Sequence, residues 1–168
     1  MRTCAYLFFL VMLFSGLMTM GVSHAKQVAG WIEKVKILPE DLIVQAKLDT
    51  GADNSSLNVP DFTLFERRGE TWVRFDVTDH AGKKARFERK VLRTSKIKLL
   101  TGGYQQRPVV QLGVCLGRHY SEVEVNLVDR RGFNYPLLVG RSFLRGRIVV
   151  DPAMEFALEP ECSGATKQ

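Results

Sequence analysis

The segment Asp49-Thr50-Gly51-Ala52 places a carboxylate, a hydroxyl and a glycine directly after an apolar stretch, Leu42 to Leu48. A buried strand of this kind would bring the Asp49 carboxylate to its end, where Thr50 can hydrogen-bond to a second loop and Gly51 permits a tight turn. Two such carboxylates close together can share a proton and activate a water molecule, one as general base and one as general acid. Asp-x-Gly is also ordinary turn chemistry, so this motif alone does not decide between catalysis and a turn.

A second segment lies far downstream and changes that balance. Leu137 to Leu144 reads Leu-Leu-Val-Gly-Arg-Ser-Phe-Leu, an apolar strand followed by Gly140 and then by residues that suit a short helix. The two segments together favour a built site over an isolated turn.

The elements that must position these segments have the texture of strands. Alternation of apolar and polar residues predicts strands at Trp72 to Val77, Pro108 to Leu116 and Val123 to Leu127. Asp79 to Gly82 predicts the turn of a hairpin between the first of these and Phe87 to Leu92. Helical turns are expected only at Arg141–Arg147 and, less clearly, at Asp61–Arg67. Many short strands at regular spacing predict an all-β barrel or sandwich in one domain.

The first 25 residues do not belong to that domain. Arg2 precedes an apolar run, Ala5 to Phe14, and the stretch ends in Ser23-His24-Ala25, the layout of a signal peptide cleaved after Ala25. An uncleaved membrane anchor is the alternative. We therefore expect a signal peptide over residues 1–25, one domain over 26–160, a flexible tail over 161–168, and a periplasmic or secreted location.

Two cysteines would remain after cleavage, Cys115 and Cys162. In an oxidising compartment they could form one disulfide. They could equally serve as two small apolar residues of the core. The sequence leaves both possibilities open.

Both chemical segments match those of a known family. Asp49-Thr50-Gly51-Ala52-Asp53 resembles the active-site loop of retroviral aspartic proteases, and Val139-Gly140-Arg141-Ser142-Phe143-Leu144 resembles their second signature. The stretch from Lys47 to Pro152 is similar to bacterial retropepsin-like aspartic peptidases, a group often labelled ATP-dependent zinc proteases. The matching pieces are KLDTGA, WVRF, RPVV, YPLLVGRSFL and VDP.

This resemblance implies an acid-protease fold, a closed β-barrel with one short C-terminal helix, and a homodimer that hydrolyses peptide bonds. Asp49 would be the catalytic carboxylate and Thr50 would hydrogen-bond across the dimer. Gly51 and Ala52 would line the substrate backbone. Asp53 would pair with Arg141 and brace the loop. One Asp-Thr-Gly per chain supplies one carboxylate, so two chains are needed for a pair.

The zinc and ATP in that label find no support in the residues. After cleavage only His80 and His119 remain as histidines, each isolated and without ligand-like spacing. The sequence contains no phosphate-binding G-x-x-x-x-G-K-[ST] motif. We expect neither a metal nor a nucleotide cofactor.

A flexible hairpin that closes over the substrate is also expected from the resemblance. The preferred segment is Thr101-Gly102-Gly103-Tyr104, which carries paired glycines just before the RPVV strand. The competing segment is the hairpin from Trp72 to Val91. An ordinary surface turn remains the alternative for both.

The chain has a formal net charge of +6, and a basic stretch runs from Lys83 to Lys98. A solvated strand face explains such a stretch. The alternative is attraction to an anionic partner such as acidic peptides, cell-wall polymer or a membrane surface. Nucleic acid is not expected, because export removes the opportunity and no aromatic platform accompanies the charges.

The function that these observations favour is an exported, homodimeric aspartic endopeptidase acting on peptides or proteins. The alternatives are a catalytically silent peptide-binding module on the same fold, or a regulatory module of the cell envelope that binds anionic polymer through the basic stretch.

Overall fold

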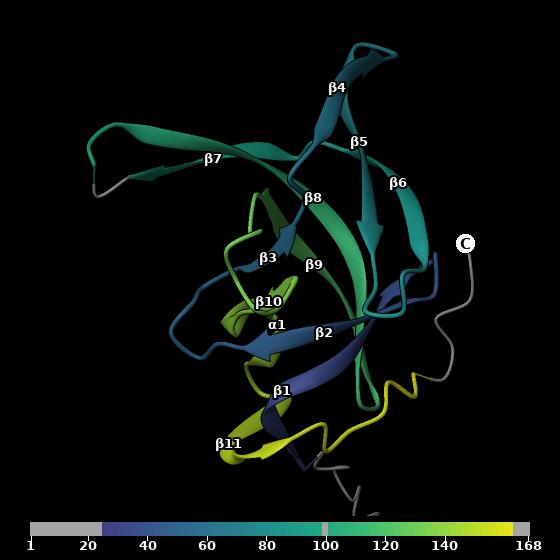
Figure 1. Cartoon of the computed structure of the whole chain (residues 1–168), viewed down its shortest axis with the longest axis vertical. Coiled ribbons are helices and arrows are strands. Elements are labelled where there is room, and N and C mark those ends of the chain that lie inside the picture. Colours follow the sequence, from purple (N-terminus) through teal and green to yellow (C-terminus); the bar gives the residue numbers. More distant parts are fainter. Residues whose placement is uncertain (1–24, 99–100, 163–168) are drawn as a thin grey trace, which may run out of the picture.

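The computed structural model describes residues 25–98 and 101–162. Its body is a closed barrel of six strands, and pairing of the first strand with β8 closes the ring (Figure 1). This confirms the predicted all-β barrel. In order around the barrel the strands are β1 (Gln27–Leu38), β2 (Leu42–Leu48), β10 (Leu137–Val139), β3 (Ser55–Asn58), β9 (His119–Val128) and β8 (Tyr104–Leu116).

Three further parts are attached to the barrel. A three-stranded sheet consists of β4 (Phe62–Arg67), β5 (Glu70–Thr78) and β6 (Lys84–Lys90). A hairpin of β7 (Arg93–Lys98) and the first half of β8 projects from the barrel as an arm (Figure 1). On the far side, β11 (Ile148–Glu155) pairs in parallel with β1.

The helical turn expected within Arg141–Arg147 is present as α1 (Arg141–Leu144). Among the described residues no helix has the length and apolar character needed to cross a membrane. The signal-peptide prediction lies almost entirely outside the described residues, which begin at Ala25.

The predicted hairpin is present as β5 and β6, with Thr78 opposite Lys84. Its turn is held by Asp79, whose Oδ1 accepts the backbone N–H groups of Ala81 and Lys83 at 2.9 and 2.8 Å. The possible helical turn at Asp61–Arg67 is wrong, because Phe62–Arg67 forms β4. Pairing with β5 along its whole length outweighs the weak local preference of this segment.

The core follows from alternation along the strands. Every second residue of β2 is buried, and its inward side chains meet those of β8 and β9 inside the barrel. Phe87 stacks on Phe75 at a ring distance of 5.3 Å and extends this core under the three-stranded sheet. Full burial of a large apolar side chain contributes on the order of 1.5–3 kcal/mol. The barrel is therefore a rigid support for the loops at its ends.

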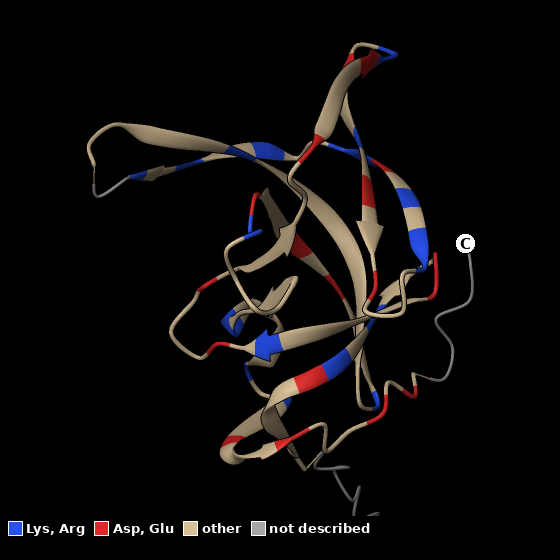
Figure 2. Cartoon of the chain, viewed as in Figure 1, with Lys and Arg blue, Asp and Glu red and all other residues tan. Residues whose placement is uncertain are grey.

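Most cations of the basic stretch are paired with carboxylates. Figure 2 shows basic segments of β6 beside acidic segments of β5. The ion pairs are Lys84–Asp76, Arg86–Asp76, Arg89–Glu40, Lys90–Glu70 and Arg93–Glu124. This pairing favours the solvated strand face over an anionic docking surface, which stays a prediction.

The structure pairs Cys115 with Cys162 in a disulfide. This decides the question that the sequence left open. Glu161 and Cys162, expected at the start of a flexible tail, are tied to the turn between β8 and β9, where the Glu161 N–H donates to the Gly117 carbonyl at 2.8 Å. Residues 163–168 of the expected tail lie outside the described residues.

Candidate active site

The two segments singled out in the sequence meet at one end of the barrel. β10 lies between β2 and β3, and Val139 pairs with Leu48, the last residue of β2. The backbone N–H of Asp49 then donates to the Val139 carbonyl at 2.9 Å. The start of the Asp49 loop is thereby fixed to the strand that precedes Gly140.

The Asp49 carboxylate is oriented by its own loop. Its Oδ1 accepts the backbone N–H of Gly51 at 2.9 Å and that of Ala52 at 3.3 Å. A Cβ at position 51 would lie 3.2 Å from this oxygen, so glycine lets the turn stay this tight. Oδ2 accepts no hydrogen bond from the part of the chain that the structure describes. One oxygen is fixed and the other is available to a water molecule or substrate.

Arg141 holds the outer part of the loop. Its guanidinium donates to the carbonyls of Thr50 and Gly51 at 3.0 and 2.7 Å and forms an ion pair with Asp53. The backbone adds two bonds, from the Arg141 N–H to the Ala52 carbonyl and from the Ser142 N–H to the Asp53 carbonyl, both 2.9 Å. A planar guanidinium with several acceptors fixes geometry well. The structure thus brings Asp53 and Arg141 together, as the resemblance to retroviral proteases implied.

Gly140 is the point of closest approach between the two segments. A Cβ on this residue would lie 2.6 Å from the backbone oxygen of Asn54, a distance that real side chains do not show. Its N–H donates to the Ser55 hydroxyl at 3.2 Å, and the Asn126 side chain donates to the Ser55 carbonyl at 3.2 Å. Glycine is therefore required here by packing.

A pocket of about 290 Å³ opens beside Asp49. Aromatic rings form much of its wall, and Trp31 meets Tyr135 edge-on at a centroid distance of 6.0 Å. Two cationic side chains, Lys47 and Arg130, also line it. The full lining is Trp31, Lys47, Asp49, Arg130, Phe133, Asn134, Tyr135 and Leu138. Such a mixed wall suits a side chain with an apolar stem and an anionic end.

Arg130 was not among the predicted site residues. It is half-buried, donates to the Ser56 hydroxyl at 3.0 Å, and lies 4.3 Å over the Phe133 ring. Burial lowers the pKa of its guanidinium, the nearby charge of Arg107 lowers it further, and the charge of Asp49 raises it. Burial also lowers the pKa of Arg107, whose guanidinium donates to Gln105 Oε1 at 2.6 and 2.8 Å. Two cations that repel each other beside one carboxylate make an attractive site for a further anion.

One signal could have pointed to Arg130. It lies in the polar run Asp129-Arg130-Arg131-Gly132, which separates the buried strand β9 from the second segment. A loop at this place must lie near the Asp49 loop, because β9 and β10 both pair with β3. Its neighbour Arg131 is exposed and paired with Asp129, so the sequence alone could not tell which arginine faces the site.

The remaining predicted residues lie elsewhere. Thr101, Gly102, Gly103 and Tyr104 are all exposed at the end of the β7–β8 arm, and residues 99 and 100 of this turn are outside the described residues. The competing hairpin turns at Asp79–Gly82 in the three-stranded sheet. Neither segment contributes a residue to the lining of the pocket beside Asp49.

The histidines are not in the Asp49 loop. His80 lies in the exposed β5–β6 turn and His119 begins β9. Within residues 25–98 and 101–162, no three His, Cys, Asp or Glu side chains come together as a metal site requires.

Comparison with known proteins finds curated relatives that are named as ligases and a family that is named as an endopeptidase. It is 33% identical over 118 residues to a probable alpha-L-glutamate ligase of Shewanella halifaxensis, and 30% identical over 118 residues to one of Desulfotalea psychrophila. Each match covers 68% of this chain but only 26% and 25% of the relative. The chain thus spans about a quarter of the length of the curated relatives it matches, and the ligase activity in their names belongs to those proteins.

A solved structure shares the fold. The crystal structure of Lpg0085, a protein of unknown function (DUF785) from Legionella pneumophila, matches with a TM-score of 0.67 and 35% identity. The match covers 79% of this chain and 98% of that one. The family model for the retropepsin-like aspartic endopeptidase RimB matches residues 28–161, which include the Asp49 loop, Gly140 and Arg141. The chain therefore belongs to the RimB-like family of retropepsin-like aspartic endopeptidases.

Proposed function

We propose that this chain is an exported aspartic endopeptidase whose active site forms between two copies, each contributing Asp49. The observation that carries the proposal is the half-built site at the end of β2. The Asp49 carboxylate is oriented through one oxygen, its loop is braced by Arg141, and the loop residues Thr50 and Gly51 are exposed in the single chain. An exposed but rigid loop is what a second copy could complete.

In the proposed mechanism the two Asp49 side chains share one proton and hold a water molecule between them. The ionised carboxylate takes a proton from the water as its oxygen attacks the scissile carbonyl, while the protonated carboxyl donates its hydrogen to the carbonyl oxygen. The tetrahedral intermediate then collapses. Its C–N bond breaks, the leaving nitrogen takes a proton, and a new carboxylic acid and a new amine are released.

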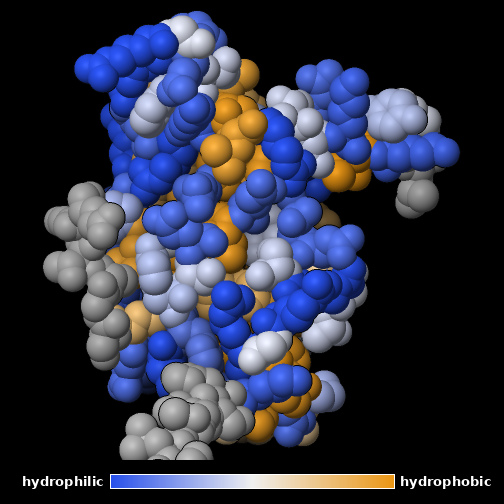
Figure 3. Space-filling model, turned by 180° about the vertical axis from the view of Figure 1, so that it is seen from behind, coloured by the Kyte–Doolittle hydropathy of each residue, from blue (hydrophilic) through white to orange (hydrophobic). Residues whose placement is uncertain are grey.

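The end of the molecule formed by β1 and β11 supports a two-fold dimer. Val28 and Val149 lie opposite each other on these strands and are 49% and 46% exposed, and Met154 and Phe156 are exposed nearby. Figure 3 shows hydrophobic atoms on this lower end of the molecule. As the outer strand of its sheet, β11 also has an unpaired backbone edge. We infer that Arg147 to Val150, at the start of β11, lies in the interface.

The chemistry beside Asp49 favours an acidic peptide. Lys47 and Arg130 line the pocket, and Arg107 is close to Arg130. Among the described residues, none of these three cations forms an ion pair, and Asp49 is the carboxylate whose charge acts on Arg130. A glutamate side chain of the substrate would place its methylenes against the aromatic wall and its carboxylate near the arginines. The names of the ligase relatives refer to the same amino acid.

The disulfide supports export. Cys115 and Cys162 are linked in the structure, and such bonds persist mainly in oxidising compartments. The layout of residues 1–25 points the same way.

Digestion of a peptide library enriched in glutamate tests the proposal. The wild-type chain should cleave it, and Asp49→Asn, which keeps the shape of the side chain, should lose all turnover while its melting temperature stays close to that of the wild type. An aspartic-peptidase inhibitor of the pepstatin type should block the wild type, and a chelator should not. The chain would be a silent binding module instead if the folded wild-type dimer binds these peptides without cleaving them and the Asp49→Asn variant binds them with the same affinity.

A further inference from the structure

The segment that follows β11, residues 156–162, crosses the end of the barrel like a strap and is fastened at two separate points. It begins where the Phe156 N–H donates to the Ile32 carbonyl at 2.8 Å and ends at Cys162. Between them, Leu158 packs against the core and Pro160 is buried. The strap therefore connects β11 to the turn between β8 and β9.

The first fastening is a buried carboxylate. Glu33 of β1 is 0% exposed, and its oxygens accept the N–H groups of Ala157 and Leu158 at 3.1 and 3.0 Å and that of Gly30 at 2.6 Å. A buried carboxylate is stable only when its acceptor capacity is used. Glu33 thus holds the first half of the strap by non-covalent bonds that can open and close.

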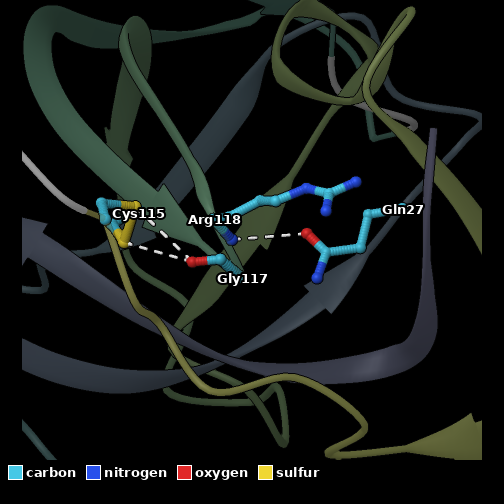
Figure 4. Close-up of a disulfide and its surroundings, with 5 residues drawn as sticks. Gln27, Cys115, Gly117 and Arg118 are labelled. Atoms are coloured by element: carbon cyan, nitrogen blue, oxygen red, sulfur yellow. Dashed lines mark hydrogen bonds between the residues drawn. A yellow bond between two sulfur atoms is a disulfide. The ribbon is translucent and has the colours of Figure 1, made fainter. Parts of the chain in front are cut away.

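The second fastening is covalent. Figure 4 shows the disulfide beside Gly117, whose carbonyl oxygen lies 3.7 Å from Cys115 Sγ and 3.6 Å from Cys162 Sγ. The same oxygen accepts the Glu161 N–H, and the adjacent Arg118 N–H donates to the Gln27 side chain of β1 at 3.3 Å. The end of the strap is thus locked to a turn that is itself tied to β1.

The two sulfur atoms differ in access. Cys115 is 0% exposed, whereas Cys162 is partly exposed. A thiolate of a dithiol reductant can attack Cys162 Sγ, which forms a mixed disulfide and releases Cys115 as a thiolate that takes up a proton. The second thiol of the reductant then closes its own disulfide and releases Cys162 as a thiol. Two electrons pass from the dithiol to the protein, and two protein thiols result.

We propose that this disulfide is a redox switch on dimer assembly: a dithiol reductant opens it, frees the strap, loosens the end of β11 and weakens the two-chain peptidase. The inference rests on the proposed function, because β11 is the edge on which the proposed dimer depends. After reduction the strap has no covalent link to the turn between β8 and β9. It is then held by its bonds to Glu33, by the packing of Leu158 and Pro160, by the exposed Lys34–Glu159 ion pair and by the backbone bonds of Phe156 and Glu161. Of the exposed apolar residues at this edge, Met154 lies near the end of β11 and Phe156 is the first residue of the strap, so their placement depends on it.

Hydrogen exchange read by mass spectrometry tests the release on the folded wild-type chain before and after treatment with dithiothreitol, with thiol titration to verify two free thiols. The amides of Ala157, Leu158 and Glu161, which donate to Glu33 and Gly117, should exchange at least about tenfold faster after reduction. Sedimentation should show a dimer dissociation constant raised at least about tenfold, with peptidase activity at limiting protein falling in proportion. Amides of β9 should not change.

Two variants separate the fastenings. In the double variant Cys115→Ala, Cys162→Ala, amide exchange and dimer assembly should match those of the reduced wild type, and dithiothreitol should change neither. Glu33→Gln with the disulfide intact should speed exchange at Ala157 and Leu158 and leave Glu161 protected until dithiothreitol is added. If reduction to two thiols leaves exchange at Glu161 unchanged, or frees the strap without altering the dimer constant, the switch is overturned. An oxidised chain that neither assembles nor cleaves peptides would instead refute the proposed function, and the exchange experiment would still decide whether the strap opens.

Discussion

Two arginines near Asp49 differ in how their charges are compensated. Arg141 has the Asp53 carboxylate and two backbone carbonyls as acceptors, so its bonding capacity is largely used inside the protein. Arg130 has the Ser56 hydroxyl and the face of Phe133, and its Nε is buried without a partner among the described residues. Arg141 therefore serves to hold the loop, whereas Arg130 has capacity left for a ligand.

The expected consequence concerns substrate choice. Arg130→Gln should lower kcat/KM for peptides with glutamate next to the scissile bond by roughly 10- to 100-fold, because a charge-assisted hydrogen bond to the substrate is lost. Peptides with a neutral residue there should change little. Paired kinetic assays on the two peptide series measure the effect.

Arg131→Gln is the matched control, since Arg131 lies in the same loop but is exposed and paired with Asp129. It should keep the wild-type preference. Equal losses on acidic and neutral peptides in Arg130→Gln would show that Arg130 supports the loop and does not select the substrate.

At the scale of elements, the site depends on the contact between β10 and the Asp49 loop. Gly140→Ala should destabilise the fold by about 1–3 kcal/mol, because the new methyl group would press on the backbone of Asn54 and the strands must separate. Urea denaturation measures this. Gly132→Ala is the control: a Cβ there meets nothing within 4 Å, so its stability should stay within about 0.5 kcal/mol of the wild type. Equal stability of both variants would mean that the two segments are not in rigid contact.

The pairing of β5 with β6 predicts a pH effect on stability. Hydrogen bonds from Arg86 and Lys84 lower the pKa of Asp76 from 3.8 to about 2. Because the folded state has the lower pKa, the ionised carboxylate stabilises the fold above pH about 4, and this contribution is lost as the pH falls toward about 2. Asp76→Asn should lower stability at neutral pH and flatten the stability curve in that acidic range. The free energy of unfolding is measured by denaturation at several pH values. If it falls equally steeply between pH about 4 and about 2 in the wild type and in Asp76→Asn, the explanation is wrong.

The elements were predictable to the degree that local patterns decide them. The β5–β6 hairpin follows from alternation and from Asp79 in its turn, and α1 follows from the glycine before Arg141. The strand β4 could not be recognised, because its backbone conformation is fixed by pairing with β5. The proximity of Arg107 to Arg130 was equally hidden, since it arises only when β8 and the loop after β9 fold against each other. Closure of the barrel by β1 and β8 is likewise a non-local event.

In the whole molecule, the barrel is the part that the structure shows, and under the proposed function it carries half of a catalytic pair. The barrel positions Asp49, β11 presents an unpaired edge, and the Cys115–Cys162 bond joins residues 47 positions apart across the barrel's end. Chain-entropy reasoning assigns such a bond on the order of 4 kcal/mol of stabilisation. We therefore expect the single chain to fold by itself, whereas the proposed chemistry requires a second copy.

Mixing wild-type chain with the Asp49→Asn variant tests that central claim most directly. The proteins are unfolded and refolded together at fixed total concentration, well above the dimer dissociation constant, and peptidase rates are compared with the all-wild-type sample. If each active site needs one Asp49 from each chain, mixed dimers are inactive, and an equal mixture should retain about one quarter of the activity. Retention of about one half would show that each chain works on its own, and the two-chain active site would then be wrong.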